Sequence, residues 1–285
     1  MNHQSAVRDQ FFKDGYALLR SPFSRDEIDF YISQLAKLSV GRGPKWTLPD
    51  GVCQHPLFWD VIFNPHILAS VRQLLGQNVQ FLQHNDLHAG FSSFHWHRDS
   101  VCRSFGKGPD WDERAEPYRL VRVGVYLQEP WGGFRLGLIR GSHRPDLYMS
   151  DAERDFIERK TGGLTKALTL AGRRDPLEDR ADWVAPEPGD CIIFDPRIIH
   201  TGSVFKGTKY SFFIAYGVDN NHFRNHFNYY RHLRGDLNYA ALHPDLVDRL
   251  QAAGLYASEE ATAPETIEGA WLPSKVFTVL ARPFK

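Results

Sequence analysis

Cysteine is scarce in this chain, and its three cysteines, Cys53, Cys102 and Cys191, are widely spaced. An odd, dispersed set favours free or buried thiols in a reducing cytoplasm over disulfides. No Cys-x-x-Cys pair occurs, which argues against a cysteine-based zinc site. No apolar run approaches the ~20 residues of a transmembrane helix, and the polar residues 1–10 are not followed by a signal-peptide apolar region. We therefore expect a cytoplasmic protein without a membrane span.

An excess of either charge sign is also missing. Lys plus Arg and Asp plus Glu number 34 each, which gives a formal net charge of +0. A nucleic-acid groove or a surface for anionic membranes usually leaves a basic surplus, so we expect neither partner. Apolar residues make up 42% and charged residues 24%, which is the composition of a globular protein and not of a disordered one.

Three segments have the pattern of helices. Residues 24–38 begin with Ser24 and Glu27 in the spacing of a capping box and continue with one apolar face. Residues 65–75 follow an asparagine, begin with proline and end before a glycine, and residues 244–253 are a third candidate. We expect all three helices to be structural.

Short segments rich in β-branched and aromatic residues follow the second helix, and Gly, Pro and Asp bound them. They cover residues 79–88, 118–128, 190–195 and 209–218. This pattern predicts a mainly β fold of the sandwich, jelly-roll or barrel kind.

The expected domain plan is one domain over residues 1–285, because no linker divides it. N-terminal helices within 24–75 precede a β core at 79–218, and residues 219–285 form a C-terminal extension of the same domain. Long polar insertions are expected between strands at 101–117 and 145–186.

A His-x-Asp motif could supply two metal ligands, because residues i and i+2 of a strand point to the same side. Two histidines and one carboxylate suit iron(II) with open coordination positions. The motif occurs three times, at His84/Asp86, His97/Asp99 and His243/Asp245. His243 is the last histidine of the chain, whereas spacing alone does not separate the other two pairs.

Three stretches in the same order resemble the phytanoyl-CoA dioxygenase family of iron(II)/2-oxoglutarate oxygenases. FSSFHWHRDS resembles its Trp-His-x-Asp segment, VRVGVYLQEPWGGFRLGLIRGSHRP its hydrophobic strand and Gly-Ser-His segment, and EPGDCIIFDPRIIHTGS the segment with its second metal-binding histidine. The resemblance implies a double-stranded β-helix core, use of O₂ and 2-oxoglutarate, and iron(II) held by His97, Asp99 and His200. His95 is then expected to support the site or to pack, and His143 to hold a turn.

The family's halogenating relatives replace the carboxylate ligand with a small residue, so the presence of Asp99 disfavours halogenation. In the family, a cation about ten residues past the second histidine, usually Arg, pairs with the far carboxylate of 2-oxoglutarate. Here Lys209 stands at that place with Ser211 two residues on, and no Arg occurs between His200 and Arg224. We therefore predict Lys209 and Ser211 as cosubstrate-binding residues, with Arg122 as the alternative cation.

One face of the strand near 119–128 is polar and the other is apolar. The polar face has Arg122, Gly124, Tyr126 and Gln128, and a mid-strand glycine lets a ligand approach the backbone. We expect this face to line the pocket, and we add Gln83 and Asn85 of the preceding strand as further lining residues. The alternating valines should face the core.

The predicted reaction is oxidation, by default hydroxylation, of a small polar metabolite that carries a negative group. Desaturation, epoxidation and ring formation use the same residues and are not separated by sequence. The insertion at 101–117 carries Arg103, Lys107, Trp111 and Arg114 and is predicted to close over the substrate. Two alternatives stay open: a cupin-type metal enzyme that does not use 2-oxoglutarate, and a non-catalytic jelly-roll binding protein. The sequence leaves the oligomeric state open.

Overall fold

The computed structural model describes residues 3–92, 95–127, 133–161, 175–258 and 266–273. Its helices are α1 (His3–Asp14), α2 (Arg25–Leu38), α3 (Gly51–Gln54), η1 (Pro56–Val61), α4 (Pro65–Leu75), η2 (Pro109–Trp111), α5 (Pro145–Tyr148), α6 (Asp151–Lys160), η4 (Glu178–Arg180), α8 (Asn221–Asn228), the π-helix η5 (Tyr229–Leu233) and α9 (Pro244–Ala252). Its strands are β1 (Tyr16–Leu19), β2 (Lys45–Pro49), β3 (Val79–Ser92), β4 (Leu120–Tyr126), β5 (Leu136–Leu138), β6 (Asp182–Val184), β7 (Cys191–Phe194), β8 (His200–Gly202) and β9 (Phe205–Val218).

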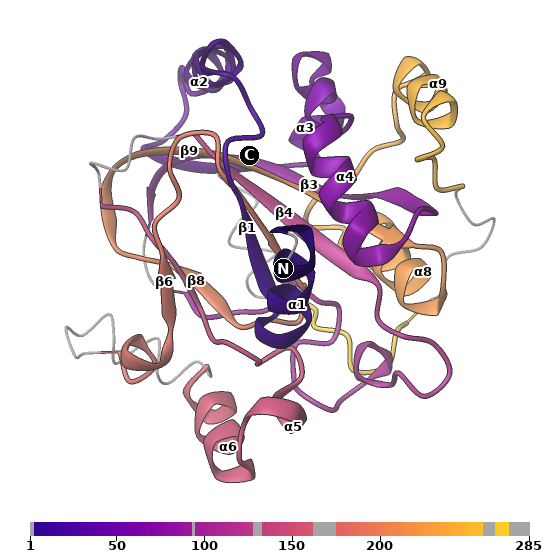
Figure 1. Cartoon of the computed structure of the whole chain (residues 1–285). Helices are drawn as coiled ribbons and strands as arrows, with labels where there is room; N and C mark the ends of the chain where they lie inside the picture. The colour runs from indigo at the N-terminus through magenta and orange to yellow at the C-terminus, as the bar shows by residue number, and fades with distance from the viewer. Residues whose placement is uncertain (1–2, 93–94, 128–132, 162–174, 259–265, 274–285) are drawn as a thin grey trace.

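Two antiparallel sheets form the β core. The large sheet has the strand order β1-β7-β4-β9-β3-β2, and the small sheet has the order β6-β5-β8. A bridge between His97 and His200 adds the segment after β3 to the edge of the small sheet. This arrangement is the predicted mainly β fold with flanking helices, and the non-consecutive strand order places segments distant in sequence next to one another (Figure 1).

The largest apolar core lies between the large sheet and helices α2 to α4, which Figure 1 shows along one side of that sheet. The apolar face predicted for β4 is part of this core: Val121, Val123, Val125 and Leu127. A second apolar cluster lies between the two sheets and includes Tyr126, Phe134 and Phe194. The polar side chains of β4 therefore face the space between the sheets.

The predicted helices are present with their expected caps. Ser24 forms both halves of a capping box with Glu27 at the start of α2. The Asn64 side chain accepts the His66 and Ile67 amides at the start of α4. The helix predicted at 244–253 is α9. Local chemistry was enough to place these elements.

The predicted strands are present, but two are longer than expected. β3 and β9 each have 14 residues and pair with one another, with register shifts between Leu82 and Asp86 and between Gly90 and Ser92. The insertion predicted at 145–186 is more regular than expected. It contains α5, α6, whose N-cap is Ser150, and η4, and its β6 completes the small sheet. None of the helices in the described ranges has the length and apolar character that a bilayer crossing requires.

Candidate metal centre

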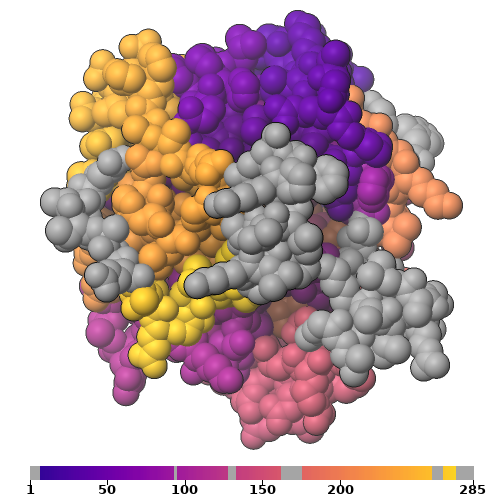
Figure 2. Space-filling view, turned by 180° about the vertical axis from the view of Figure 1, so that it is seen from behind, coloured from indigo at the N-terminus to yellow at the C-terminus, as the bar shows by residue number. Residues whose placement is uncertain are grey.

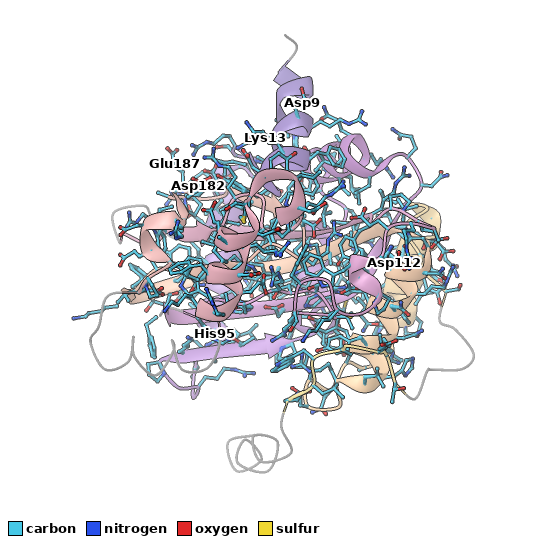
Figure 3. All side chains as sticks on the ribbon, turned by 90° about the horizontal axis from the view of Figure 1, so that it is seen from below. Asp9, Lys13, His95, Asp112, Asp182 and Glu187 are labelled. Carbon is cyan, nitrogen blue, oxygen red and sulfur yellow. The ribbon has the colours of Figure 1, made fainter. Side chains whose placement is uncertain are left out.

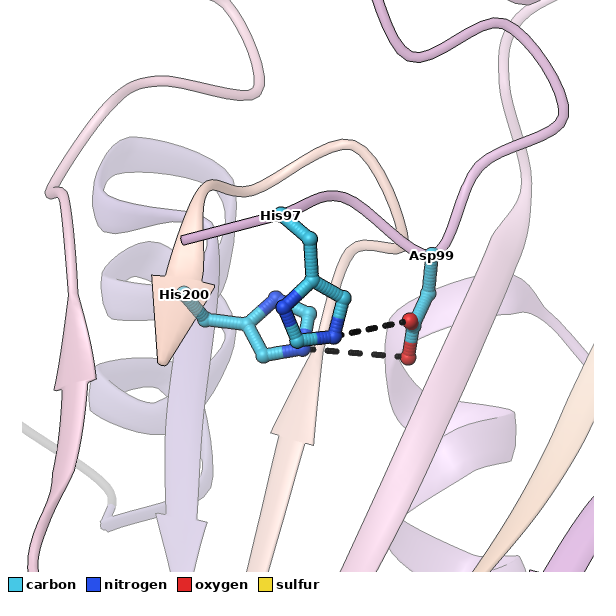
Figure 4. Close-up of side chains that lie close together, drawn as sticks. All are labelled: His97, Asp99 and His200. Carbon is cyan, nitrogen blue, oxygen red and sulfur yellow. Dashed lines mark ion pairs between the residues drawn. The ribbon is translucent and has the colours of Figure 1, made fainter. Parts of the chain in front are cut away.

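His97, Asp99 and His200 come together where the segment after β3 meets the start of β8 (Figure 4). Backbone hydrogen bonds run both ways between His97 and His200, at 3.1 and 3.0 Å, and the Asp99 amide donates to the Pro196 carbonyl at 2.8 Å. One ligand atom of each residue lies within 4.8 Å of the others. In the part of the chain that the structure describes, this is the one cluster of its kind.

Backbone carbonyls fix which ring nitrogen of each histidine is free. The His97 Nδ1 lies 2.6 Å from the His95 carbonyl, and the His200 Nδ1 lies 3.1 Å from the Ile198 carbonyl. A carbonyl only accepts, so each Nδ1 donates a hydrogen and each Nε2 keeps its lone pair. Both Nε2 atoms face Asp99, at 3.5 and 3.8 Å from its carboxylate oxygens.

The environment also favours the protonation states that a metal requires. Burial lowers the pKa of His97 well below its ordinary value, with the neighbouring His200 adding to the shift, and burial lowers the pKa of His200 as well. Burial opposes ionisation of Asp99, but the positive charge of Arg122 outweighs it and holds its pKa below the usual range. Two neutral imidazoles and one carboxylate are the donor set that suits iron(II).

The other two His-x-Asp pairs have other partners. His243 is the N-cap of α9 and accepts the Asp245 amide. His84 contacts His226 at 2.8 Å between ring nitrogens, and Asp86 forms an ion pair of 2.8 Å with Arg122.

A cavity of about 190 Å³ adjoins the three ligands. Three residues predicted for the pocket line it, namely Arg122, Tyr126 and Lys209. The other lining residues, besides the ligands, are His84, Asp86, His88, Ser92, Phe134, Leu136, Gly202 and Phe213. Gln128 lies outside the described residues.

Lys209 is a half-buried cation at this cavity. Its Nζ lies 4.8 Å from the centre of the Phe134 ring, and burial together with the nearby Lys45 lowers its pKa to about 8. Ser211 is buried and pairs in register with Tyr126 of β4. Neither the Ser211 Oγ nor the Tyr126 Oη has a hydrogen-bond partner within the described chain. Tyr126 and Lys209 line the cavity, whereas Ser211, two residues from Lys209 on β9, is not among its lining residues. An unpartnered hydroxyl and a cation in one cavity fit a carboxylate-bearing cosubstrate.

Arg122 is already engaged. Its Nη2 donates to Asp86 at 2.8 Å, its Nη1 donates to the His84 carbonyl at 3.1 Å, and its Nε lies 3.5 Å from the Asp99 carboxylate. These contacts hold Asp99 in position and leave Lys209 as the freer cation.

Gln83 and Asn85 are not brought to the cavity. Gln83 donates to Asp50 at 3.1 Å and Asn85 donates to Asp50 at 3.0 Å, on the other face of β3. Because strand residues alternate, the even-numbered positions of β3 face the ligands. Asp86 and His88 therefore line the cavity, although they were not among the predicted lining residues; only the His84/Asp86 motif pointed to this strand.

Tyr230 is a further residue of the site, and no sequence pattern pointed to it. Its hydroxyl donates to the backbone carbonyl of Asp99 at 3.2 Å, and its ring stacks on His84 with 3.5 Å between centroids. His95 stacks on His97 at 5.0 Å, in line with a supporting role. His143 does not line this cavity, and its Nε2 lies 3.2 Å from the Phe12 carbonyl.

Several solved structures share this fold. One is the α-ketoglutarate-dependent epimerase SnoN from nogalamycin biosynthesis, in its complex with Fe³⁺, α-ketoglutarate and nogalamycin RO. It is 15% identical to this chain, with a TM-score of 0.53, and the match covers 95% of this chain and 96% of that chain. HygX from Streptomyces hygroscopicus, with nickel and 2-oxoglutarate bound, is 19% identical, with a TM-score of 0.54 over 76% and 87% of the two chains. No curated protein matches the chain.

Two sheets that bring a pair of imidazoles and one carboxylate to a small cavity define the class of mononuclear non-haem iron oxygenases. The chain belongs to the phytanoyl-CoA dioxygenase (PhyH) family, whose profile matches residues 11–209. The fold is therefore the double-stranded β-helix, and the protein is an iron(II)/2-oxoglutarate-dependent oxygenase that uses O₂, as the resemblance predicted.

Proposed function

We propose that this enzyme hydroxylates a small polar metabolite that carries a negative group. The observation that carries the proposal is the cluster of His97, Asp99 and His200 beside a small cavity with Lys209 in its wall. The two histidine Nε2 atoms and the Asp99 carboxylate would hold iron(II), which supplies oxygen activation when bound.

The far carboxylate of 2-oxoglutarate is proposed to bind Lys209 and the Ser211 hydroxyl, with the Tyr126 hydroxyl as a further donor. Support comes from the unpartnered Ser211 and Tyr126 oxygens and from the position of Lys209. Arg122 would act mainly by holding Asp99 and Asp86 in place. Arg122 remains the second candidate for the cosubstrate carboxylate.

Arg103 is our candidate for binding the negative group of the substrate. It belongs to the insertion 101–117, and its charge contributes to the lowered pKa of Asp99, after the larger effects of Arg122 and the two histidines. Its guanidinium lies 3.8 Å from the centre of the Trp271 ring, and its buried Nε has no hydrogen-bond partner within the described chain. By contrast, Arg114 of the same insertion pairs with Asp112.

Residues of the C-terminal extension contact the insertion 101–117. This contact favours a role for both segments in covering the substrate. The Trp271 amide donates to the Val101 carbonyl at 2.9 Å, and the Cys102 thiol donates to the Glu268 carbonyl at 3.5 Å. Figure 2 shows residues 266–273, in yellow, beside the magenta part of the chain that contains this insertion. We propose on this basis that residues 1–285 act as one oxygenase domain.

The ligands bound in structurally similar proteins bear on the class of substrate. SnoN has been solved with nogalamycin RO and HygX with hygromycin B, so these relatives bind small molecules. We propose a small-molecule substrate here as well, with no nucleic-acid or membrane partner, since the charge is balanced. Three buried, free cysteines agree with a cytoplasmic enzyme.

A succinate-release screen tests the proposal. Purified protein with iron(II), 2-oxoglutarate and O₂ is offered small polar metabolites, amino-acid derivatives and acyl thioesters. The expected result is one succinate and one CO₂ for each substrate that gains an oxygen atom. Oxidation of a substrate without succinate would favour the cupin-type alternative. Stoichiometric iron binding with no O₂ uptake for any compound would favour a non-catalytic binding protein.

A further inference from the structure

A second cavity of about 350 Å³ is larger than the cavity beside the metal ligands. It lies where α1, the end of α4 and residues from the 113–119 and 195–197 segments meet, and we call it the α1 cavity. No residue lines both cavities. A ligand of the α1 cavity would therefore not displace 2-oxoglutarate or the oxidised substrate.

The two acids of the α1 cavity share one arginine as their ion-pair partner. Asp195 and Glu113 each form an ion pair of 2.8 Å with Arg197, whose side chain is only 3% exposed. The Arg197 guanidinium also lies 3.9 Å from the centre of the Tyr118 ring. This buried group is fixed in place and carries one net negative charge, from two carboxylates and one guanidinium.

Three further arginines line the same cavity, and of these Arg144 is near enough to Glu113 to help lower the pKa of that carboxyl. Arg8, Arg119 and Arg144 are exposed at its edge, and none of them forms an ion pair among the described residues. The Arg8 guanidinium lies 5.6 Å from the centre of the Phe12 ring. Figure 3 labels Asp9 and Lys13 on α1. Neither of them lines the cavity, and nor does Asp14 at the end of the same helix. The α1 cavity thus has an excess of positive charge in a chain that is neutral as a whole.

The remaining lining is partly apolar. Phe11, Leu74 and Leu75 are buried residues of its wall. Two other lining residues, Tyr118 and His143, have buried polar atoms without a hydrogen-bond partner in the described chain, the Tyr118 Oη and the His143 Nδ1. A concave site with apolar walls and unpaired cations suits a small organic anion better than a bare inorganic ion.

Residues 195–200 connect this cavity to the metal centre. The segment begins with Asp195 and Arg197 in the cavity wall and ends with His200. Between them, the Pro196 carbonyl accepts the amides of Asp99 and Ser100 at 2.8 and 2.9 Å. A shift of Asp195 or Arg197 would therefore move backbone atoms that position two of the three metal ligands.

We propose that the α1 cavity binds a small organic anion with phosphate or carboxylate groups. Its occupancy changes the affinity of the His97–Asp99–His200 site for iron(II) through residues 195–200. The coupling rests on the proposed metal site, whereas binding of the anion does not.

Binding is tested on the full-length protein by calorimetric titration with glycerol phosphate in one arm and citrate in the other. We expect one molecule bound per chain in at least one arm. The double variant Arg119→Gln/Arg144→Gln should weaken binding by roughly ten-fold or more, since two charge-assisted contacts are lost. Arg42→Gln removes one exposed arginine outside the cavity and should leave binding unchanged.

Three outcomes would overturn the proposed anion site. The first is no binding of either anion, and the second is that Arg42→Gln weakens anion binding as much as the double variant does. The third is loss of anion binding in Lys209→Met, which would place the anion in the cavity beside His97, Asp99 and His200. Coupling is read as the change in apparent iron(II) affinity caused by the bound anion. Because these anions also chelate iron in solution, the wild type is compared with the double variant. An identical change in both proteins would overturn the coupling.

Discussion

At the scale of the residue, the histidines of this chain differ in which ring nitrogen is free. In His97 and His200 the Nδ1 donates a hydrogen bond to a backbone carbonyl, and both Nε2 atoms face the Asp99 carboxylate. In His243 the Nδ1 instead accepts an amide hydrogen at the start of α9. The same residue types at the same spacing therefore perform different tasks.

Replacement of His97 by alanine should abolish stoichiometric iron(II) binding, because one of three protein ligands is lost. Equilibrium dialysis with metal analysis measures this. His243→Ala is the matched control: it should lower the free energy of unfolding by ~1 kcal/mol through loss of the α9 cap while it leaves iron binding intact. Full iron binding by His97→Ala, with loss in His84→Ala, would show that the wrong His-x-Asp had been assigned.

The lowered pKa of Lys209 gives a second prediction. Below its pKa of about 8 the side chain is a cation that attracts the 2-oxoglutarate carboxylate, and it loses this charge as the pH rises through that value. The KM for 2-oxoglutarate should therefore increase above about pH 8. Lys209→Arg should remove this pH dependence, because arginine stays charged. Equal pH profiles for the two proteins would exclude Lys209 as the anchor.

At the scale of the element, the C-terminal extension contributes to the metal centre through the π-helix η5, Tyr229–Leu233. π-Helical turns are rare and often lie at functional sites. Here the turn carries Tyr230, which contacts both the Asp99 backbone and the His84 ring. The extension is therefore part of the site, although the family profile ends at residue 209.

Tyr230→Phe should weaken iron(II) binding by roughly two- to ten-fold, as expected for the loss of one hydrogen bond of ~0.5–1.5 kcal/mol. The ring can keep its stacking on His84. Tyr216→Phe also removes a buried tyrosine bond to a carbonyl, that of Ile62 at 2.7 Å, and serves as the control. It should leave iron affinity unchanged. Equal iron affinities in the wild type and Tyr230→Phe would refute a supporting role for Tyr230.

At the scale of the whole molecule, the candidate metal site lies between the two sheets. His200 begins β8 of the small sheet, and Arg122, which contacts Asp99, belongs to the large sheet. A ligand that binds only the folded state stabilises it, by about 2.7 kcal/mol at a concentration of a hundred times Kd. Iron(II) with 2-oxoglutarate should therefore raise the Tm by a few degrees in thermal unfolding. His97→Ala should show no such increase, and a similar increase in both proteins would indicate binding elsewhere.

Features that depend on near neighbours in the chain could be predicted from the amino-acid sequence. The capping box of Ser24 and Glu27, the Asn64 cap and the alternation of β4 each follow from local hydrogen bonds or strand periodicity. Family resemblance added the pairing of His97 and Asp99 with His200, which local physics could not provide.

Contacts between segments that are distant in the sequence became known from the folded structure. It showed that β3 presents Asp86 and not Gln83 to the cavity, because its register against β9 fixes which face is inward. It brought Tyr230 to Asp99 across 131 positions of sequence. Arg197 forms ion pairs with two acids, Glu113 and Asp195. Arg103 forms no ion pair among the described residues. A side chain's partners are set by packing between elements, and no local pattern encodes that.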